Sequence, residues 1–275
     1  MRKLIYGQAY EVCPQMRLLV KDPSRAAQLS AIFEQLGGRR FAELIVVRAS
    51  QKGLYMQCVD AAKVCLFDGE LTRDWFDEYD GPQTGGELRI GVVLRVMARV
   101  LSTLSGSQSI EMRTEGDGVD KLHVTLSGDP DQLDKFFQVQ CVDADVDILD
   151  LSNQPESQVD LVLPTKRMVE LVAQLLIFDS VLRVDFGEEA ISFESEGDEG
   201  SMKVAVELDD VTEYAIESPL RQQFSLSYLQ TMCGFGKLAR EIVMKFTDGN
   251  PMETRYDLGD ASSVALYLAP KIEDD

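Results

Sequence analysis

The chain has 275 residues, of which 45% are hydrophobic and 8% aromatic, enough for packed cores in one large domain or two medium ones. Asp and Glu number 47 against 27 Lys and Arg, which gives a formal net charge of −20 at pH 7 and a sequence pI near 4.4. Such a surface repels nucleic acid and anionic membranes at long range, so any contact with DNA requires a local patch of basic residues.

The cysteine and histidine content argues against disulfide-stapled and metal-bound architectures. Five cysteines form an odd set without any CxxC pair, and His123 is the only histidine, so neither a disulfide framework nor a structural zinc site is expected.

The stretch 1–15 mixes Tyr, Gly, Gln and Glu where a signal peptide would have an apolar run. We therefore expect no signal peptide, no membrane span and a reducing compartment, the cytosol or nucleus.

Residues 16–142 have the pattern of one α+β unit. Asp22 and Pro23 supply an N-cap and a favourable first position for a helix, whose apolar residues then recur at three- and four-residue steps. The expected order is strand 16–20, helix 24–36, strands 43–49, 53–59 and 62–67, loop 80–86, helix 92–104, and strands 109–114, 122–126 and 136–142.

Residues 159–275 repeat this order. The expected elements are strand 159–163, helix 165–178, strands 181–186, 190–194 and 202–208, helix 226–233, and strands 241–246, 252–256 and 264–268. Corresponding helices lie about 130 to 140 residues apart, which indicates a tandem duplication. Antiparallel hairpins dominate, so each unit is expected to place both helices on one face of a sheet.

An acidic stretch, 141–158, joins the two halves and holds five acidic residues but no Lys or Arg. Its start alternates apolar and acidic residues, which is typical of a strand. Ile148, Leu149 and Leu151 follow no helical or strand period, which favours an exposed docking surface. The alternative is a solvated linker whose leucines pack against the nearest domain. The expected boundaries are 16–142 for the first domain, 143–158 for the connector and 159–275 for the second domain.

No motif for catalysis is found. Catalysis of the Ser/His/Asp kind needs a base, and His123 lies in an alternating pattern as an ordinary strand residue. Asp143, Asp145 and Asp147 lack the Gly and the closing Glu of an EF-hand loop, so a solvated acidic face accounts better for them. GxGxxG, Walker and HExxH motifs are absent. We expect no enzyme activity, no cofactor and no metal site.

Several segments resemble the PCNA (proliferating cell nuclear antigen) family of sliding clamps. The tail ALYLAPKIEDD at 265–275 resembles the family's YYLAPKIEDE, and the shared run YLAPKIED is highly specific. Elsewhere, MQCVDAAKVCL at Met56 resembles LQSMDSSHVSL, GVVLRVMARVL at Gly91 resembles GVNLTSMSKIL, DADVDILDL at Asp143 resembles DLDVEQLGI, FSLSYLQTM at Phe224 resembles FALRYLNFF, and NPMETRYDLGD at Asn250 resembles VPLVVEYKIAD. The resemblance covers roughly residues 16–275 and agrees with the duplication.

The resemblance implies an α+β DNA-clamp fold of two tandem domains and a ring of three identical subunits around duplex DNA. Such a ring is a non-catalytic processivity factor for DNA polymerase. Its partners would be duplex DNA, bound without sequence preference, a DNA polymerase, a clamp loader and clients that carry PCNA-interacting peptides. It would work in the nucleus, or at the replication site of a DNA virus in its host cell. The alternative is a checkpoint-type clamp subunit in a heterotrimer.

The resemblance also implies site residues by position. The client pocket would comprise Val59, Val64, Leu66, Leu149, Leu151, Pro251, Tyr267, Ala269 and Pro270. The expected DNA contacts lie in or beside the four helices: Lys21, Arg25, Arg95, Arg99, Lys166, Arg167, Lys237 and Arg240. Helical spacing puts Arg95 and Arg99 together, away from the apolar face. Edge strands near 133–142 of one subunit and 200–208 of the next are expected to pair.

This chain departs from the family pattern at several places. Residues 1–15 extend beyond the family's usual start, and the loop 80–88 is longer. Lysines usual on the inner helices are only partly kept: the aligned stretch of the first helix carries Ala27 and Gln28, and that of the third carries Ala173. In the connector, Asp150 and Ser152 stand where Gly and Pro are usual.

Overall fold

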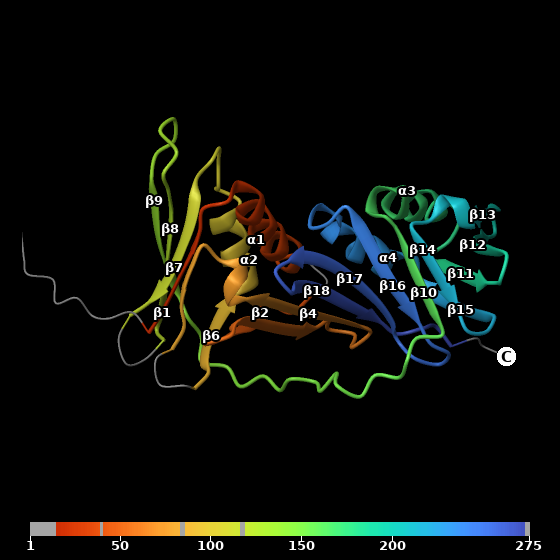
Figure 1. The fold of residues 1–275 in the computed structure, drawn as a ribbon, viewed down its shortest axis with the longest axis horizontal. Helices are drawn as coiled ribbons and strands as arrows, with labels where there is room; N and C mark the ends of the chain where they lie inside the picture. The colour runs from red at the N-terminus through yellow and green to blue at the C-terminus, as the bar shows by residue number, and fades with distance from the viewer. Residues whose placement is uncertain (1–14, 39–40, 83–85, 116–118, 273–275) are drawn as a thin grey trace, which may run out of the picture.

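The computed structural model describes residues 15–38, 41–82, 86–115 and 119–272. Within these ranges the chain forms four α-helices and eighteen strands, and the strands make three antiparallel sheets (Figure 1). The expected extension 1–15 lies outside the described residues except for Gln15, and the expected loop 80–86 is described only at its ends. No helix in the described ranges is long and apolar enough to cross a membrane.

The first half begins with a strand that leads into a well-capped helix. The Asp22 carboxylate accepts hydrogen bonds from the N–H groups of Ser24 and Arg25, and Pro23 occupies the first turn. The helices are α1 (Pro23–Leu36) and α2 (Leu94–Leu101). The strands are β1 (Met16–Val20), β2 (Leu44–Ser50), β3 (Gly53–Val59), β4 (Cys65–Thr72), β5 (Glu78–Asp80), β6 (Leu88–Val93), β7 (Ser109–Thr114), β8 (Lys121–Ser127) and β9 (Lys135–Gln140).

The second half has the same order of strands and helices. Its helices are α3 (Thr165–Leu175) and α4 (Leu226–Cys233), the latter followed by the 3₁₀ turn η3 (Gly234–Lys237). Its strands are β10 (Val159–Pro164), β11 (Val181–Phe186), β12 (Ala190–Gly197), β13 (Gly200–Glu207), β14 (Glu213–Ile216), β15 (Leu220–Ser225), β16 (Glu241–Phe246), β17 (Met252–Gly259) and β18 (Ser262–Leu268). The tandem duplication predicted from the sequence is confirmed.

Each half builds two sheets around its helix pair. The first half contributes β5-β1-β7-β8-β9 and β4-β3-β2-β6, and the second contributes β14-β10-β16-β17-β18 and β13-β12-β11-β15. In the first half α1 packs against β1 and β7, and α2 packs against β6 and β9. The expectation of a single sheet per half is therefore wrong. The helices are buried over a broad arc, as Ala26, Leu29, Ile32 and Phe33 of α1 show, and one sheet face cannot cover such an arc.

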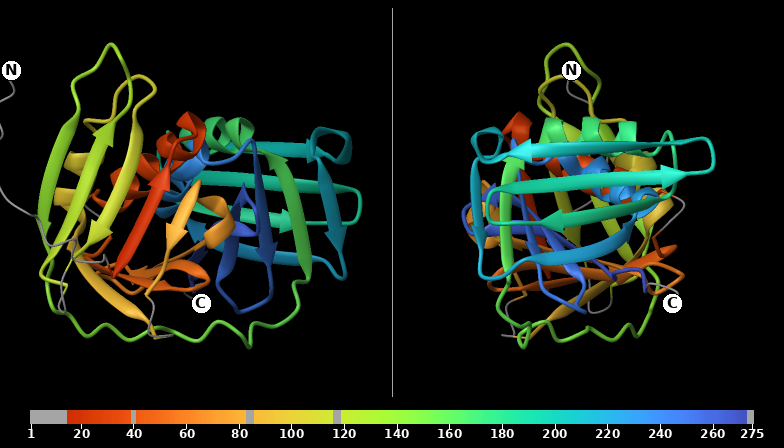
Figure 2. Two further views of the ribbon diagram at one scale, coloured as in Figure 1. Left: turned by 60° about the vertical axis from the view of Figure 1, so that its left-hand side comes forward. Right: turned by 90° about the vertical axis from the view of Figure 1, so that its right-hand side faces the viewer.

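Strands β18 and β4 join the two halves into one nine-stranded sheet. They pair antiparallel from Ser263 opposite Glu70 to Leu268 opposite Cys65. Among the described residues, β9 ends the five-stranded sheet and β13 ends the four-stranded sheet. These two edges lie at opposite ends of the elongated molecule, as the label of β9 at one end and that of β13 at the other show (Figure 1). Figure 2 shows the four-stranded sheet of the second half face on.

The helices and the connector occupy opposite sides of the molecule. All four helices lie on one side, and the chain between β9 and β10 runs along the other (Figures 1 and 2). The main core lies between the helices and the sheets and includes Trp75, Phe67, Phe186 and Tyr256, each less than 2% exposed. The fold thus separates a helical face from a connector face.

The predicted strand at the start of the connector is wrong. No strand is found from 141 to 150, although Ala144 and Val146 are half-buried between exposed aspartates. The alternation reflects an extended segment lying on the surface. It joins no ladder because only one backbone bond, from Val142 N–H to Gly91 O at 2.8 Å, holds its start to β6.

Other helix and strand boundaries in the structure differ from the predicted ones. Helix α2 begins at Leu94 and not at 92, because Val92 and Val93 pair with Ile45 and Leu44 in β6. Helix α3 ends at Leu175, three residues earlier than predicted. Strands β5, β6, β14 and β15 were not predicted. Two of these strands, β5 and β14, have only three and four residues, too few for alternation to be recognised.

Candidate functional site

The start of the connector, with Val142 just before it, is attached to the sheet at four points, one of which is the ion pair of Arg89 on β6 with Asp145 at 2.9 Å. Val142 N–H donates to Gly91 O, and the Arg48 guanidinium donates to the Val146 carbonyl at 2.8 Å. Leu149 then exchanges two hydrogen bonds with one side-chain amide of β3, that of Gln57. From Asp150 to Pro155 the one hydrogen bond found among the described residues is internal, from Ser152 N–H to Asp150. The second half of the connector is therefore held much less firmly.

A small apolar cluster lies on the outer face of the nine-stranded sheet, separate from the main core. Leu66 and Tyr267 are opposite each other on β4 and β18, and Val59 lies opposite Leu66 on β3. Together with Ala265 they form the cluster, and Leu151 of the connector packs against it. Leu66 and Tyr267 are almost fully buried, so Leu151 covers apolar side chains that water would otherwise reach.

The turn between β3 and β4 is built around one buried carboxylate. Asp60 is 4% exposed and accepts hydrogen bonds from the N–H groups of Val64 and Cys65, both at 2.7 Å, and from Tyr228 Oη of α4 at 2.6 Å. Burial acts to raise the pKa of Asp60, but the hydrogen bonds outweigh it and hold the pKa below its ordinary value. The Val64 carbonyl accepts from Ala269 N–H at 3.0 Å, so this turn also holds the C-terminal segment.

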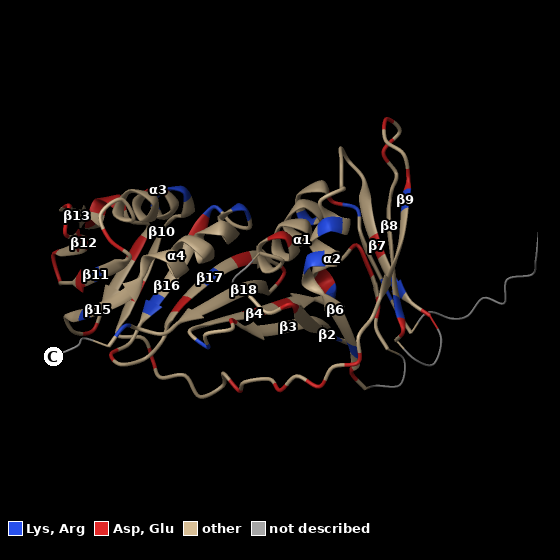
Figure 3. Cartoon of the chain, turned by 180° about the vertical axis from the view of Figure 1, so that it is seen from behind, with Lys and Arg blue, Asp and Glu red and all other residues tan. Residues whose placement is uncertain are grey.

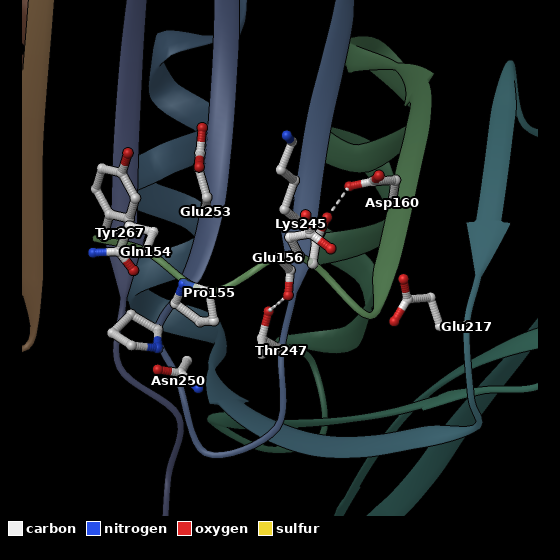
Figure 4. A pocket seen from close by; sticks show the side chains of 12 residues that line it. Gln154, Pro155, Glu156, Asp160, Glu217, Lys245, Thr247, Asn250, Glu253 and Tyr267 are labelled. Atoms are coloured by element: carbon white, nitrogen blue, oxygen red, sulfur yellow. Dashed lines mark hydrogen bonds between the residues drawn. The ribbon is translucent and has the colours of Figure 1, made fainter. Parts of the chain in front are cut away.

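A cavity of about 460 Å³ adjoins this cluster beneath the second half of the connector. Figure 4 shows Tyr267 and Gln154 at one side and Asp160 and Glu217 at the other, with Lys245 between Glu253 and Asp160. Pro251 also lines the cavity. The end at Tyr267 thus combines ring side chains with the amides of Gln154 and Asn250, and the other end carries the carboxylates of Asp160 and Glu217.

The predicted client-pocket residues are only partly brought together. Val59, Leu66, Leu151 and Tyr267 share one cluster, Pro251 and Tyr267 share the cavity, and Val64 and Ala269 are joined by a hydrogen bond. Pro270 follows Ala269 and is half-buried. Leu149 is the exception, because its side chain is 52% exposed and stands outside the cluster.

The predicted DNA-contacting residues gather on the helical face. Figure 3 shows basic residues on the helices, while acidic residues predominate on the connector and sheet ends. Four of the eight are exposed and have no ion pair with any described residue: Arg95, Arg99, Lys237 and Arg240.

The other four basic residues are in ion pairs. Lys21 donates to Glu78 at 2.8 Å, and hydrogen bonds from Lys21 and Arg17 lower the pKa of Glu78 to about 2. Arg25 binds the Trp75 carbonyl and the carboxylate of Asp260 in the β17–β18 turn. The remaining pairs are Lys166 with Glu170 at 3.8 Å and Arg167 with Asp210 at 2.9 Å. These pairs reduce the positive charge that the helical face presents.

Comparison with known proteins decides the family. A model of the proliferating cell nuclear antigen N-terminal domain matches residues 24–148, and a model of its C-terminal domain matches residues 153–271. The chain belongs to the PCNA family. Both halves of the duplication are thus clamp-type domains of this family, and the predicted DNA-clamp fold is confirmed.

Curated relatives of this PCNA-family chain come from eukaryotes and archaea. Proliferating cell nuclear antigen 2 of Drosophila melanogaster is 22% identical over 82% of this chain and 87% of that protein. Proliferating cell nuclear antigen of Chaetomium thermophilum is also 22% identical, over 82% and 88%. A DNA polymerase sliding clamp of Thermococcus sibiricus is 25% identical over 86% and 97%.

Sequence reasoning missed the polar residues that organise the connector face. Gln57 and Asp60 are 7% and 4% exposed, and each bonds a segment distant in sequence. Alternation places Gln57 with Tyr55 and Val59 on one face of β3, but a Gln on the outward face of a strand is ordinary, so the sequence gives no signal of its contact with the connector. No local signal distinguishes Asp60 from an ordinary turn aspartate.

The buried carboxylate leads to a prediction about stability and pH. Replacing Asp60 with Asn removes the negative charge and turns one of its two acceptor oxygens into an NH2 donor. Two of the four donors, which are three N–H groups and Tyr228 Oη, then lose their acceptor, so we expect a loss of about 1–3 kcal/mol of unfolding free energy at neutral pH. A depressed pKa stabilises the fold above the unfolded-state pKa, and this stabilisation is lost as pH falls through the folded-state pKa.

Urea denaturation at several pH values measures both effects. The difference between wild type and the Asp60→Asn variant should be full at pH 7 and should shrink at acidic pH, below about 4. Asp143→Asn, on the exposed part of the connector, serves as the control and should change little. A difference that stays constant down to acidic pH would show that the Asp60 charge is not the stabilising feature.

Proposed function

We propose that this protein is a DNA sliding clamp, a ring of three copies that encircles duplex DNA and docks replication proteins on its outer surface. One observation carries the proposal: β9 and β13, two of the edge strands among the described residues, are the duplicated counterparts of β18 and β4, which pair within the chain. We take residues 16–142 and 159–275 as the two clamp domains and 143–158 as the connector.

The internal junction serves as a template for the proposed subunit interface. Within the chain, Leu266 of β18 lies opposite Phe67 of β4. Phe137 of β9 and Leu266 of β18 hold the same place in their two halves. Each pairs with the equivalent residue of the strand before it, which is β8 in the first half and β17 in the second. Met202 of β13 corresponds to Phe67 by the same reasoning. Phe137 of one subunit is therefore expected opposite Met202 of the next.

The surfaces beside both edges suit such a contact. Leu133 and Phe136, before and within β9, are 85% and 76% exposed. At the other edge, a hollow of about 330 Å³ between α3 and β13 is lined in part by Leu171, Val204 and Val206. Exposed sheet edges with apolar flanks favour association, and pairing through a closed ring removes both edges at once.

Charge substitution at either edge tests the ring. We expect Phe137→Asp and, separately, Met202→Asp to reduce the particle mass from three times 30.7 kDa toward the single-chain value at micromolar concentration, measured by light scattering. Ser192→Asp, on the interior strand β12, should leave the mass unchanged.

Two results would contradict this assignment. If both edge variants keep the wild-type mass, the strands are not the interface. If the wild type is monomeric and assembles only with other chains, the heterotrimeric checkpoint-type alternative is favoured.

On the helical face, we propose weak contacts with DNA phosphates that carry no sequence information. The overall charge of −20 opposes DNA at long range, so binding relies on the local cations that are not in ion pairs. Arg95 and Arg99 of α2 meet this condition, as do Lys237 and Arg240 beside α4. Contacts of this kind allow sliding because no base edge is read.

Reversing the charge on α2 tests the DNA-facing role. The double variant Arg95→Glu with Arg99→Glu should lower polymerase stimulation and decrease the slope of log K against log salt by about 2, with the oligomer intact. The control is Arg113→Glu with Lys121→Glu, on the outer face of the five-stranded sheet, which should have a much smaller effect. Equal losses in both variants would indicate a general charge effect and no site on α2.

On the connector face, we propose that client peptides with a Gln and an apolar plug dock beside Leu149 and Leu151. The half-exposed Leu149 would contact the apolar residues of the peptide, and the apolar cluster under Leu151 would form the base of the pocket. Burying one large apolar side chain contributes roughly 1.5–3 kcal/mol, so two or three anchors are enough for micromolar affinity after ordering costs. The segment 269–271 would contribute hydrogen bonds to the peptide through its carbonyl groups, because the N–H groups of Ala269 and Lys271 are bonded to Val64 O and Gln223 O and Pro270 has no N–H.

Truncating both leucines tests the docking surface. Leu149→Ala with Leu151→Ala should weaken a synthetic peptide of this composition at least about tenfold, or about 1.4 kcal/mol, with a nearly unchanged Tm. Ile148→Ala, next to Leu149 and 38% exposed, is the control. Unchanged affinity, or a large fall in Tm, would show that the leucines only cover the sheet.

A further inference from the structure

The side chain of Gln57 bridges the sheet and the connector in an unusual way. Its Oε1 accepts the Leu149 N–H at 2.8 Å, and its Nε2 donates to the Leu149 carbonyl at 3.1 Å. Gln57 is 7% exposed and belongs to β3, 92 residues before Leu149. Both main-chain groups of one connector residue are thus bonded by a single buried amide.

We propose that Gln57 is a positioning residue that fixes the register of the connector and thereby presents Leu149 and Leu151 to client peptides. The proposal rests on the client docking proposed above. A primary amide presents an N–H and a C=O along one edge, as a strand residue presents its own N–H and C=O to a neighbour, so it can replace the neighbouring strand that the connector lacks.

The orientation of the Gln57 amide follows from its neighbours on the sheet. The Asp68 carboxylate, opposite Gln57 on β4, can only accept, and it receives hydrogen bonds from Tyr55 Oη and from Gln57 Nε2. Because the Tyr55 hydroxyl hydrogen is used on Asp68, its oxygen accepts from Gln57 Nε2 at 2.9 Å. The two N–H groups of Gln57 face three acceptors, so one N–H is shared between Tyr55 Oη and Asp68 and the other is left for the Leu149 carbonyl. The amide nitrogen therefore faces this pair, and Oε1 is left to accept the Leu149 N–H.

A fixed amide gives the connector a fixed register. If the connector slipped by one residue, Ile148 or Asp150 would take the place of Leu149 opposite Gln57, and Leu151 would be displaced from its place on the apolar cluster. In the register held by Gln57, the Leu149 side chain is 52% exposed and Leu151 packs on Leu66 and Tyr267. Beyond Leu149 the connector is held only loosely until Thr247 Oγ1 donates to the Glu156 carbonyl at 3.3 Å. Gln57 thus marks the boundary between the held part and the part that can yield to a client.

Hydrogen exchange tests this role directly in the full-length protein. In Gln57→Met, which keeps the side-chain length and removes both hydrogen-bonding atoms, the Leu149 amide should exchange at least tenfold faster. The Val142 amide, bonded to Gly91 O, should keep its protection. The matched control is Gln222→Met. Gln222 is also 7% exposed and donates to Thr247 O, and no hydrogen bond joins it to Leu149 among the described residues.

Peptide affinity is the second measurement. The client-type peptide, with a Gln and an apolar plug, should bind Gln57→Met at least fivefold more weakly than wild type and bind Gln222→Met equally well. Gln57→Asn is a second variant, because its amide is intact but one carbon too short to reach Leu149. It should reproduce both effects, which a general loss of polarity would not explain.

The outcomes separate the two proposals. Unchanged Leu149 exchange in folded Gln57 variants would overturn the positioning role, as would faster exchange with unchanged peptide affinity. If the amides of Leu149 and Val142 both exchange faster in Gln57→Met and in Gln57→Asn, the positioning role is also overturned, since Gln57 would then support the fold as a whole. If wild type itself binds no peptide, the docking proposal fails, while the exchange measurement still decides whether Gln57 holds the connector.

Discussion

The antiparallel pairing of β18 with β4 is the interaction on which the rest of the structure depends. It joins two duplicated halves through main-chain hydrogen bonds, and it buries Leu266 and Leu268 against the core at the same time. Because the β18–β4 pairing already joins the two halves, their association does not depend on the connector. It can lie on the surface as an exposed segment whose residues are free to meet other molecules.

Acidic and basic residues are distributed differently on the helical face and the connector face. The chain has 20 more acidic than basic residues, and several of its cations are used in ion pairs that hold elements together. Arg25 is one example, since it links α1 of the first half to the β17–β18 turn of the second and also lies over the Trp75 ring. Such residues contribute to architecture, and the remaining unpaired cations on the helical face oppose a strongly negative background.

The sequence was sufficient for the fold class, the duplication and most elements, because caps and alternation are local. Helix α4 and strand β16 have the predicted bounds, and Asp22 caps α1 as expected. Short strands such as β14 were missed because they show no periodicity. The start of the connector was misassigned because alternation alone does not reveal whether a neighbouring strand exists.

The site residues were less predictable than the fold. Exposure of Leu149 followed from its position in an acidic, aperiodic stretch, and the packing of Leu151 did not. The partner of Arg25 is 235 residues away, and Gln57 and Leu149 are 92 residues apart. Contacts at such separations are set by the way the sheets close on each other, and no local pattern encodes them.

The close approach of the connector to β6 imposes a steric condition on one position. Val142 crosses β6 so near Gly91 that a β-carbon at this residue would lie 2.0 Å from the Val142 carbonyl oxygen, far inside van der Waals contact. The chain can leave β9 along this path only because residue 91 has a hydrogen atom where every other residue has carbon. The glycine that begins GVVLRVMARVL also begins the family's GVNLTSMSKIL. Its lack of a side chain therefore sets how closely the start of the connector can approach β6.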